Sequence, residues 1–284
     1  MAASKSRKEL RQDWADQPAD GVSTTQELYL RETEDSDDDD DDRDYLAMQI
    51  GDDLPDFTAE STHGEIKFYE ATENQWTLFV SFSRNYDPVA TSELAQLAKM
   101  LPEFDERKVR VYGHSCNTQT NHEKWIQATE ELLDCTVTFP LIADHEAKVA
   151  RLFGLVRHGC RVPVRGLLPA SLVVVADPNQ NIQYHARAAV CFLWRDASRR
   201  FAPRPQAQYP DTTGRNFDEI IRAVDALQLR HANPTVACGV NWMVGEDVFI
   251  TNDVPKAKAK ELFPRGFVEI RPWFRLAPPP EAGS

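Results

Sequence analysis

Three short apolar runs, separated by segments with helical periodicity, limit the folds open to this chain more than any other feature. The runs cover residues 76–82, 109–112 and 172–176, and their nearly unbroken apolar character predicts buried central strands. Apolar residues recur at helical spacing in the segments 91–101 and 217–227. We therefore predict an α/β fold in which amphipathic helices pack on a sheet of buried strands.

The first 47 residues differ from the rest of the chain in charge. Residues 1–50 hold six Lys and Arg against fifteen Asp and Glu, which accounts for −9 of the net charge of −13. Mutual repulsion within the acidic run 34–44 opposes compact packing, so we predict that residues 1–47 form a disordered acidic extension. The weak charge of the remaining chain argues against a basic nucleic-acid surface and against attraction to anionic lipid.

The composition changes again after Leu229, where prolines become frequent over a short region. We predict a main domain over residues 48–230, a small C-terminal domain over 231–276 and a loose tail over 277–284. The chain has no apolar run of about 18 residues, and its first twelve residues lack the apolar stretch of a secretion signal. We therefore expect a cytoplasmic protein that does not bind a membrane.

The cysteines and histidines show no spacing that is typical of a bound metal. The five cysteines are widely separated and include no Cys-x-x-Cys pair, and the seven histidines include no His-Glu-x-x-His motif. We expect neither a disulfide framework, nor a metal site, nor a bound cofactor.

Several segments resemble the peroxiredoxins, and above all their one-cysteine subfamily. The resemblance rests on the runs IGDDLPDF, WTLFVSFSRNYDPV and YPDTTGRNFDEI, which begin at residues 50, 76 and 209, and on the C-terminal Asn241-Trp242 and AKELFPRG elements. It spans about residues 50–275. It implies a thioredoxin-like (peroxiredoxin) fold, a small C-terminal peroxiredoxin domain, thiol-dependent peroxidase activity and a homodimer.

The residues that carry the family's catalysis are replaced in this chain. In peroxiredoxins a Pro-x-x-x-Thr/Ser-x-x-Cys motif begins a helix, its Cys attacks the peroxide, and a distant Arg stabilises the thiolate. By resemblance, the Pro, hydroxyl, nucleophile and distant Arg positions are held here by Ser83, Asp87, Ala90 and Ser171. Because a methyl group can be neither ionised nor oxidised to a sulfenic acid, Ala90 cannot perform that chemistry.

Charged residues near these positions have a simpler role. Asp87 followed by Pro88 is a favourable helix start, since the carboxylate accepts backbone N–H groups and Pro suits the first turn. The same carboxylate would raise the pKa of a nearby thiol, which opposes the family's chemistry. Arg84 and Arg215 match residues around the family's pocket, and we expect them to pair with a carboxylate such as Asp87 or Glu93.

Cys116 is the candidate for a displaced redox centre. It follows the strand predicted over residues 109–114, and His114 lies two residues before it. A single Cys at a strand end is also typical of a packed, unreactive side chain. Both interpretations stay open.

An insertion near residues 186–208 combines arginines with aromatic residues. Because Arg and Trp are enriched at interface anchors, this segment and the acidic extension are candidates for binding a partner protein. The residues that we single out are Trp194, Arg195, Arg199 and Arg200. A solvated loop is an equally simple interpretation, and stacking on single-stranded RNA is a weaker one, since nucleic acid is an unexpected partner for an acidic chain.

Together these observations favour a peroxiredoxin-like protein that has lost the peroxidatic site and serves as a binding or assembly module. The competing hypothesis is a thiol-dependent peroxidase or redox sensor that acts through Cys116. A third is an RNA-associated protein that uses the arginine-rich insertion.

Overall fold

The computed structural model of the chain describes residues 50–155, 171–188, 208–209 and 213–280. The predicted acidic extension over residues 1–47 lies outside these ranges, as does most of the insertion. The partner-binding candidates Trp194, Arg195, Arg199 and Arg200 therefore also lie outside the described residues.

Eight strands form the larger of two sheets in the described residues. They are β1 (Thr58–Ser61), β2 (Gly64–Lys67), β3 (Trp76–Ser81), β4 (Val109–Ser115), β5 (Leu141–Ala143), β6 (Ser171–Ala176), β7 (Ile182–Ala188) and β8 (Gln208–Tyr209). Their order is β2-β1-β5-β4-β3-β6-β7-β8. β3 runs parallel to β4 and antiparallel to β6, and β4 runs parallel to β5. The three apolar runs of the sequence correspond to β3, β4 and β6 at the centre of this sheet.

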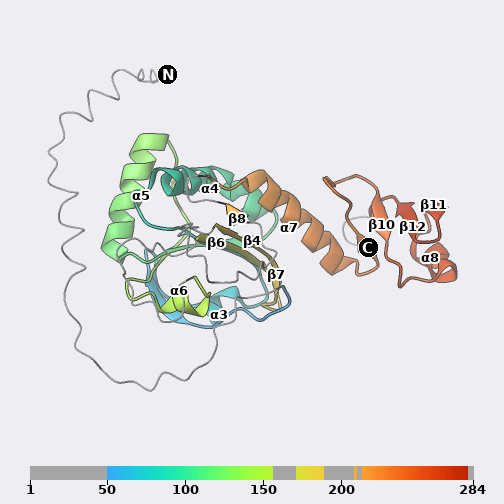
Figure 1. Cartoon of the computed structure of the whole chain (residues 1–284), viewed down its shortest axis with the longest axis horizontal. Helices are drawn as coiled ribbons and strands as arrows, with labels where there is room; N and C mark the ends of the chain where they lie inside the picture. Colours follow the sequence, from blue (N-terminus) through green and yellow to red (C-terminus); the bar gives the residue numbers. More distant parts are fainter. Residues whose placement is uncertain (1–49, 156–170, 189–207, 210–212, 281–284) are drawn as a thin grey trace, which may run out of the picture. The chain divides into compact units, whose positions relative to one another are not determined.

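Helices cover both faces of the larger sheet (Figure 1). α4 (Pro88–Glu106), α5 (Gln119–Leu133) and α7 (Phe217–Ala232) pack on one face, and the short helices α3 (Phe68–Thr72) and α6 (Lys148–Leu152) pack on the other. Along β3, Leu78 and Val80 join the first core and Phe79 joins the second. Both faces of the strand are therefore buried, which explains why its sequence is apolar without alternation.

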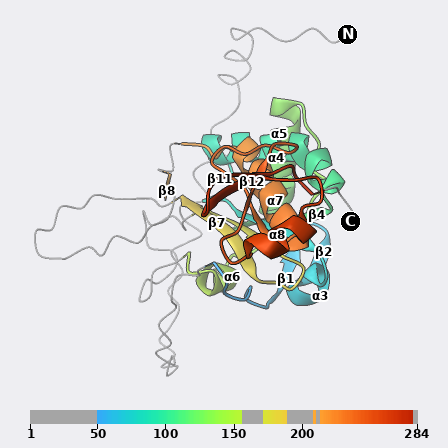
Figure 2. The same cartoon turned by 90° about the vertical axis from the view of Figure 1, so that its right-hand side faces the viewer.

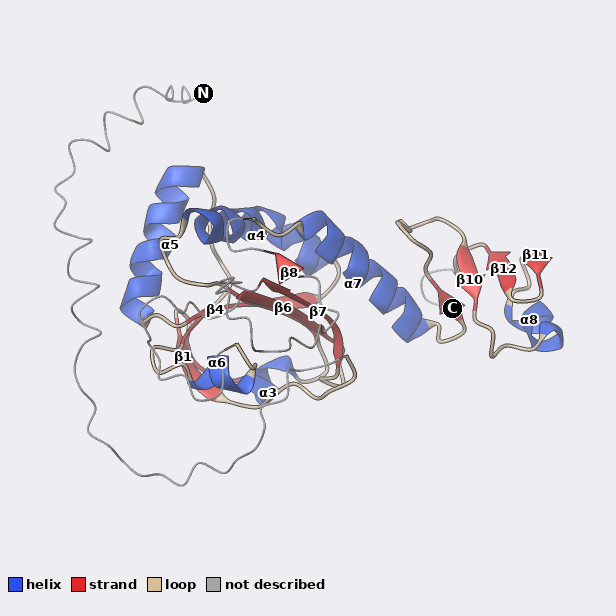
Figure 3. Ribbon diagram, in the orientation of Figure 1, coloured by secondary structure: helices blue, strands red, loops and turns tan. Residues whose placement is uncertain are grey.

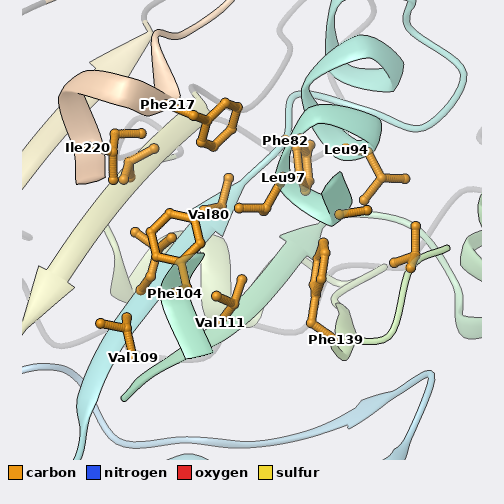
Figure 4. Packing of buried hydrophobic residues seen from close by; sticks show 14 of the residues in the cluster. Val80, Phe82, Leu94, Leu97, Phe104, Val109, Val111, Phe139, Phe217 and Ile220 are labelled. Atoms are coloured by element: carbon orange, nitrogen blue, oxygen red, sulfur yellow. The ribbon is translucent and has the colours of Figure 1, made fainter. Parts of the chain in front are cut away.

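The first core lies between the sheet and the three longer helices (Figure 4). Phe82 from the end of β3, Leu94 and Leu97 from α4 and Phe217 from α7 meet there. Trp125 of α5 packs edge-on against Phe82, with their ring centroids 5.6 Å apart. This core holds the beginning of α4 against the end of β3, and it thereby positions the candidate site.

A second sheet, drawn in red beyond α7 in Figure 3, contains four strands. It contains β9 (Val236–Ala237), β10 (Val248–Ile250), β11 (Val268–Arg271) and β12 (Phe274–Ala277) in the order β11-β12-β10-β9. Figure 2 shows α8 (Lys256–Leu262) beside these strands. The second sheet has a small core of its own. Trp242 and Phe263, which belong to the C-terminal elements of the family resemblance, are buried in it. Ala226 and Leu229 of α7 also pack against that core.

Candidate functional site

The beginning of α4 is built from the residues that the sequence predicts for it. Asp87 is the N-cap, Pro88 is the first helical residue, and one carboxylate oxygen of Asp87 accepts the backbone N–H groups of Val89 and Ala90, both at 3.0 Å. The side chain of Asp87 thus satisfies two of the donors that a helix start leaves without partners. Ala90 lies in the first turn and is only 3% exposed.

The four positions that the resemblance assigns to the family's catalytic residues lie at this helix start. β3 leads directly into the loop that contains Ser83 and Asp87, and Ala90 follows in α4. Ser171 begins β6, whose pairing with β3 sets Leu172 opposite Ser81. The backbone therefore brings Ser171 to the same end of β3. The structure describes the side chains of Ser83, Asp87 and Ala90 but only the backbone of Ser171.

Both arginines of the pocket face carboxylates, as expected. The Arg84 guanidinium lies 3.9 Å from Asp87 and is largely exposed, which makes this a weak pair. Arg215 is held differently. Its side chain is 3% exposed, and that of its partner Glu93 is 8% exposed.

The Arg215–Glu93 pair is multiply bonded. One Glu93 oxygen, Oε1, accepts both the backbone N–H of Arg215, at 2.8 Å, and its Nε–H, at 2.9 Å. A further guanidinium N–H donates to the backbone oxygen of Ser81 at 3.2 Å, and the guanidinium lies 5.4 Å from the centroid of the Phe82 ring. The pair ties the start of α7 to α4 and to the end of β3. Glu93 neutralises the charge of Arg215 inside the protein, so this charge is not available to bind a ligand.

A second polar cluster lies at the carboxyl ends of β4 and β5. His114 of β4 contacts Ser81 through Nδ1, at 2.9 Å from Oγ, and Asp144 through Nε2, at 3.1 Å from Oδ2. The same Asp144 oxygen accepts the backbone N–H of Ala150 at 2.7 Å. Ser81, His114 and Asp144 are all buried. Ser81 has no exposed surface, so this Ser-His-Asp arrangement cannot offer its hydroxyl to a substrate.

Cys116 borders this cluster. Its Sγ lies 4.0 Å from Asp144 Oδ2. Burial, reinforced by the negative charge of Asp144, raises the pKa of the Cys116 thiol to about 12. Burial also raises the pKa of the other two described cysteines, Cys135 and Cys238. The thiolate that peroxide reduction needs is therefore disfavoured at every cysteine in the described ranges.

His114, Cys116 and Asp144 also form a group of three metal-ligand types. One ligand atom from each lies within 4.8 Å of the others. The metal-binding motifs sought in the sequence do not predict this site. Its third member, Asp144, lies 28 residues after Cys116, which is outside the spacing of those motifs. The one local signal is the pattern His-x-Cys at the end of a buried strand.

A third network, next to the second, contains residues that the sequence reading did not single out. Asn85 bonds Ser115 and Asn121 and approaches Nδ1 of His122 at 3.1 Å, and Nε2 of His122 lies 3.2 Å from the backbone oxygen of Ile142. Burial, and to a lesser degree the electrostatic effect of the neighbouring His114, lowers the pKa of His122 to about 4. His122 is therefore neutral at physiological pH.

Known proteins resemble this chain over most of its length. The family model described as the AhpC/TSA family matches residues 50–185. The 1-Cys peroxiredoxin of Dictyostelium discoideum is 34% identical over 233 residues, which cover 82% of this chain and 86% of that protein. Peroxiredoxin-6 of Rattus norvegicus is 32% identical over 221 residues, which cover 76% of this chain and 89% of that protein.

Solved structures agree with this result. A yeast mitochondrial 1-Cys peroxiredoxin matches with a TM-score of 0.69 at 34% identity, over 81% of this chain and 99% of the other. The peroxiredoxin 6 of Arenicola marina matches with a TM-score of 0.68 at 28% identity, over 83% of this chain and 100% of the other.

The central sheet, covered by helices on both faces, and the capped helix that follows β3 define a thioredoxin-like α/β protein. Within that class, the chain belongs to the peroxiredoxin family. None of the helices in the described ranges is long and apolar enough to cross a membrane.

Proposed function

We propose that this chain is a peroxiredoxin without a peroxidatic site, and that it works as a binding or assembly module. The observation that carries the proposal is the start of α4, where the position of the nucleophile is a buried methyl group and the helix N–H groups already bond an internal carboxylate. A peroxidatic thiolate would need those N–H groups and the positive end of the helix for its own charge.

The charges around Ala90 support the same proposal. Asp87 adds a negative charge within three residues of position 90, and a like charge raises the pKa of a thiol. The buried guanidinium of Arg215 is paired with Glu93. By the sequence resemblance, Ser171 stands where the family has its distant Arg.

The alternative enzyme, a peroxidase or redox sensor that acts through Cys116, has less support. A thiol with a pKa of about 12 is almost entirely protonated at pH 7. A thiol rather than a thiolate reacts slowly with peroxide.

Restoring the nucleophile tests the proposal. We expect the natural chain to consume no hydrogen peroxide in the presence of a thiol reductant. We expect Ala90→Cys to react no faster than a free thiol, because Asp87 opposes ionisation and no hydroxyl orients the peroxide. Oriented hydrogen bonds to a developing charge contribute roughly 3 to 4 kcal/mol in enzymes. The combination of Ala90→Cys, Asp87→Thr, Ser83→Pro and Ser171→Arg should recover much more of the rate.

Stopped-flow measurement of thiol oxidation compares these variants. Ser92→Cys, which adds an exposed thiol two residues along the same helix, is the matched control for a cysteine near a helix start. Rapid peroxide consumption by the natural chain, or a fast reaction of Ala90→Cys alone, would overturn the proposal.

The C-terminal sheet supports self-association as one form of assembly. Val240 is 92% exposed in the loop after β9, and Trp273 is 66% exposed in the turn between β11 and β12, beside the exposed Val268 and Ile270. Val268, Ile270 and Trp273 are close together in the sequence, and exposed apolar patches are typical of protein interfaces. A homodimer is therefore the assembly that we propose, in line with the family resemblance.

Light scattering at micromolar concentration should give the mass of a dimer. The double variant Val268→Glu, Trp273→Lys should shift it to a monomer, whereas Leu132→Lys, which alters an exposed apolar residue of α5, should leave it unchanged. A monomeric natural chain would refute this form of assembly. The acidic extension and the insertion are further candidate surfaces for a partner protein, and a cytoplasmic location also stays a proposal.

A further inference from the structure

The cluster at the ends of β4 and β5 has no role in the function proposed above. It combines a thiol, an imidazole and a carboxylate on three different segments, and it is largely shielded from solvent. We propose that His114 Nε2, Cys116 Sγ and Asp144 Oδ2 form a binding site for one zinc ion.

Two of the three ligand separations suit a zinc ion after small adjustments, and the third, between Nε2 of His114 and Sγ of Cys116, lies within 4.8 Å. Bonds of about 2.0 to 2.3 Å at tetrahedral angles place ligand atoms about 3.3 to 3.6 Å apart. Nε2 of His114 and Oδ2 of Asp144 are 3.1 Å apart, and Sγ of Cys116 is 4.0 Å from the same oxygen. The first distance must lengthen by a few tenths of an ångström, and the second must shorten by about half an ångström. Cys116 follows β4 directly and is not itself in a strand, so its side chain can make that movement.

Two further contacts already orient the ligands. Ser81 Oγ lies 2.9 Å from the other ring nitrogen of His114, and the backbone N–H of Ala150 donates to Asp144 Oδ2 at 2.7 Å. Metal-binding imidazoles and carboxylates usually have such outer partners, which fix the ring and the carboxylate in place. Here Ser81 directs Nε2 of His114 toward Asp144.

The donor set selects the ion. Sulfur and imidazole nitrogen together favour zinc over magnesium and calcium, which prefer oxygen alone. Three protein ligands leave the fourth tetrahedral position to water. Cys116 is partly exposed and gives the ion a route from solvent.

Zinc binding releases one proton. The thiol of Cys116 loses its proton to the buffer as the sulfur–zinc bond forms. In the proposed complex His114 binds the ion through the lone pair of Nε2, which leaves the ring proton on Nδ1, 2.9 Å from Ser81 Oγ. No oxidant or reductant takes part.

Cobalt(II), which reports sulfur ligation in its absorption spectrum, tests the site in the full-length protein. We expect one equivalent of cobalt to produce a near-ultraviolet thiolate-to-cobalt band, and one equivalent of zinc to remove that band. Cys116→Ser, a nearly isosteric change, should abolish it. Cys135→Ser and Cys160→Ser should retain the band, because neither residue is among the proposed ligands. Cys135 lies elsewhere in the fold.

Two more variants separate binding from folding. Asp144→Asn keeps the side-chain shape and should weaken cobalt binding while the band, where formed, still shows sulfur. Ser81→Ala should weaken binding by about tenfold to 100-fold, the usual effect of removing an outer partner of a ligand, without loss of the band. Circular dichroism identifies the variants that remain folded. A natural chain that gives no band, or a band that persists in folded Cys116→Ser, would overturn the proposal.

Discussion

The start of α4 and the ends of β4 and β5 both hold polar groups in a buried setting, but they treat charge in opposite ways. At the start of α4 both carboxylates are bonded: Asp87 to the helix N–H groups, and Glu93 to Arg215. At the strand ends the groups are linked through His114, and two neighbours, Cys116 and His122, have strongly displaced pKa values.

The two regions differ in whether they hold groups that can still change their proton or ligand state. A closed set of paired charges stabilises a scaffold but holds no group that readily changes its proton or ligand state. A cluster with displaced pKa values is a more frequent setting for binding or reaction. In this peroxiredoxin, the start of α4, where the sequence resemblance places the family's catalytic position, is of the first kind, and the strand ends are of the second kind.

The largest effect that would sharpen this comparison comes from Glu93. Glu93→Gln leaves the Arg215 charge buried without its counter-charge, and we expect the free energy of unfolding to fall by about 3 to 5 kcal/mol. Urea denaturation measures it. Glu103→Gln, which removes the more exposed partner of Arg107, is the control and should change the same quantity by less than about 1 kcal/mol. Equal effects of the two variants would show that the α4 pair is no scaffold contact.

Lowering the pH should destabilise the protein through His122, which lies beside the strand-end cluster. The unfolded chain protonates His122 near pH 6.5, whereas the folded protein does so only near pH 4. Between these values the unfolded state binds more protons, so stability is present above about pH 6.5 and falls as the pH drops toward 4, by about 3 kcal/mol.

Denaturation at several pH values, with and without His122→Gln, isolates this contribution. The variant cannot protonate and should show a flatter pH dependence than the natural chain. His145→Gln, which alters an exposed histidine, should keep the natural dependence. Parallel curves for the natural chain and His122→Gln would contradict the assignment.

The cap of α4 should have a smaller effect. Asp87→Ala removes the acceptor for two N–H groups, and we expect a loss of about 1 kcal/mol in the free energy of unfolding. Asp87→Asn retains an oxygen acceptor and should recover most of it. If Asn proves as harmful as Ala, the charge of Asp87 rather than its hydrogen bonds is what the fold uses.

Arg84 gives the smallest expected change. Its guanidinium is 58% exposed and lies at the distance limit of a pair with Asp87, so Arg84→Ala should alter the free energy of unfolding by at most a few tenths of a kcal/mol. The measurement at low and high salt should agree within error. A larger, salt-sensitive loss of the free energy of unfolding would show that Arg84, like Arg215, stabilises the fold.

The sequence was informative where one local rule decides the structure. The apolar runs identified β3, β4 and β6, because a strand buried on both faces has no polar alternation. The pair Asp87 and Pro88 identified the start of α4 by capping chemistry alone. Of the two carboxylates expected beside the pocket arginines, Asp87 faces Arg84 and Glu93 binds Arg215.

The strand-end cluster could not be predicted in the same way. Ser81 meets His114 because the parallel pairing of β3 and β4 sets these two residues opposite each other, and Asp144 follows β5, which pairs with β4. A slip of one residue in either pairing would turn the side chains to the other face of the sheet. Register depends on the packed core as a whole, so the motif spacings contain no trace of this contact.

The way in which α4 begins bears on how such a protein changes over evolutionary time. The helix start depends on Asp87 and Pro88, whereas position 90 must only be small enough to fit the core that encloses Ala90. Cysteine exceeds alanine by a single sulfur atom, so it changes the volume needed at this position less than most other residues would. Scaffold and reactivity are thus inherited through separate residues, and either can drift while the other is kept.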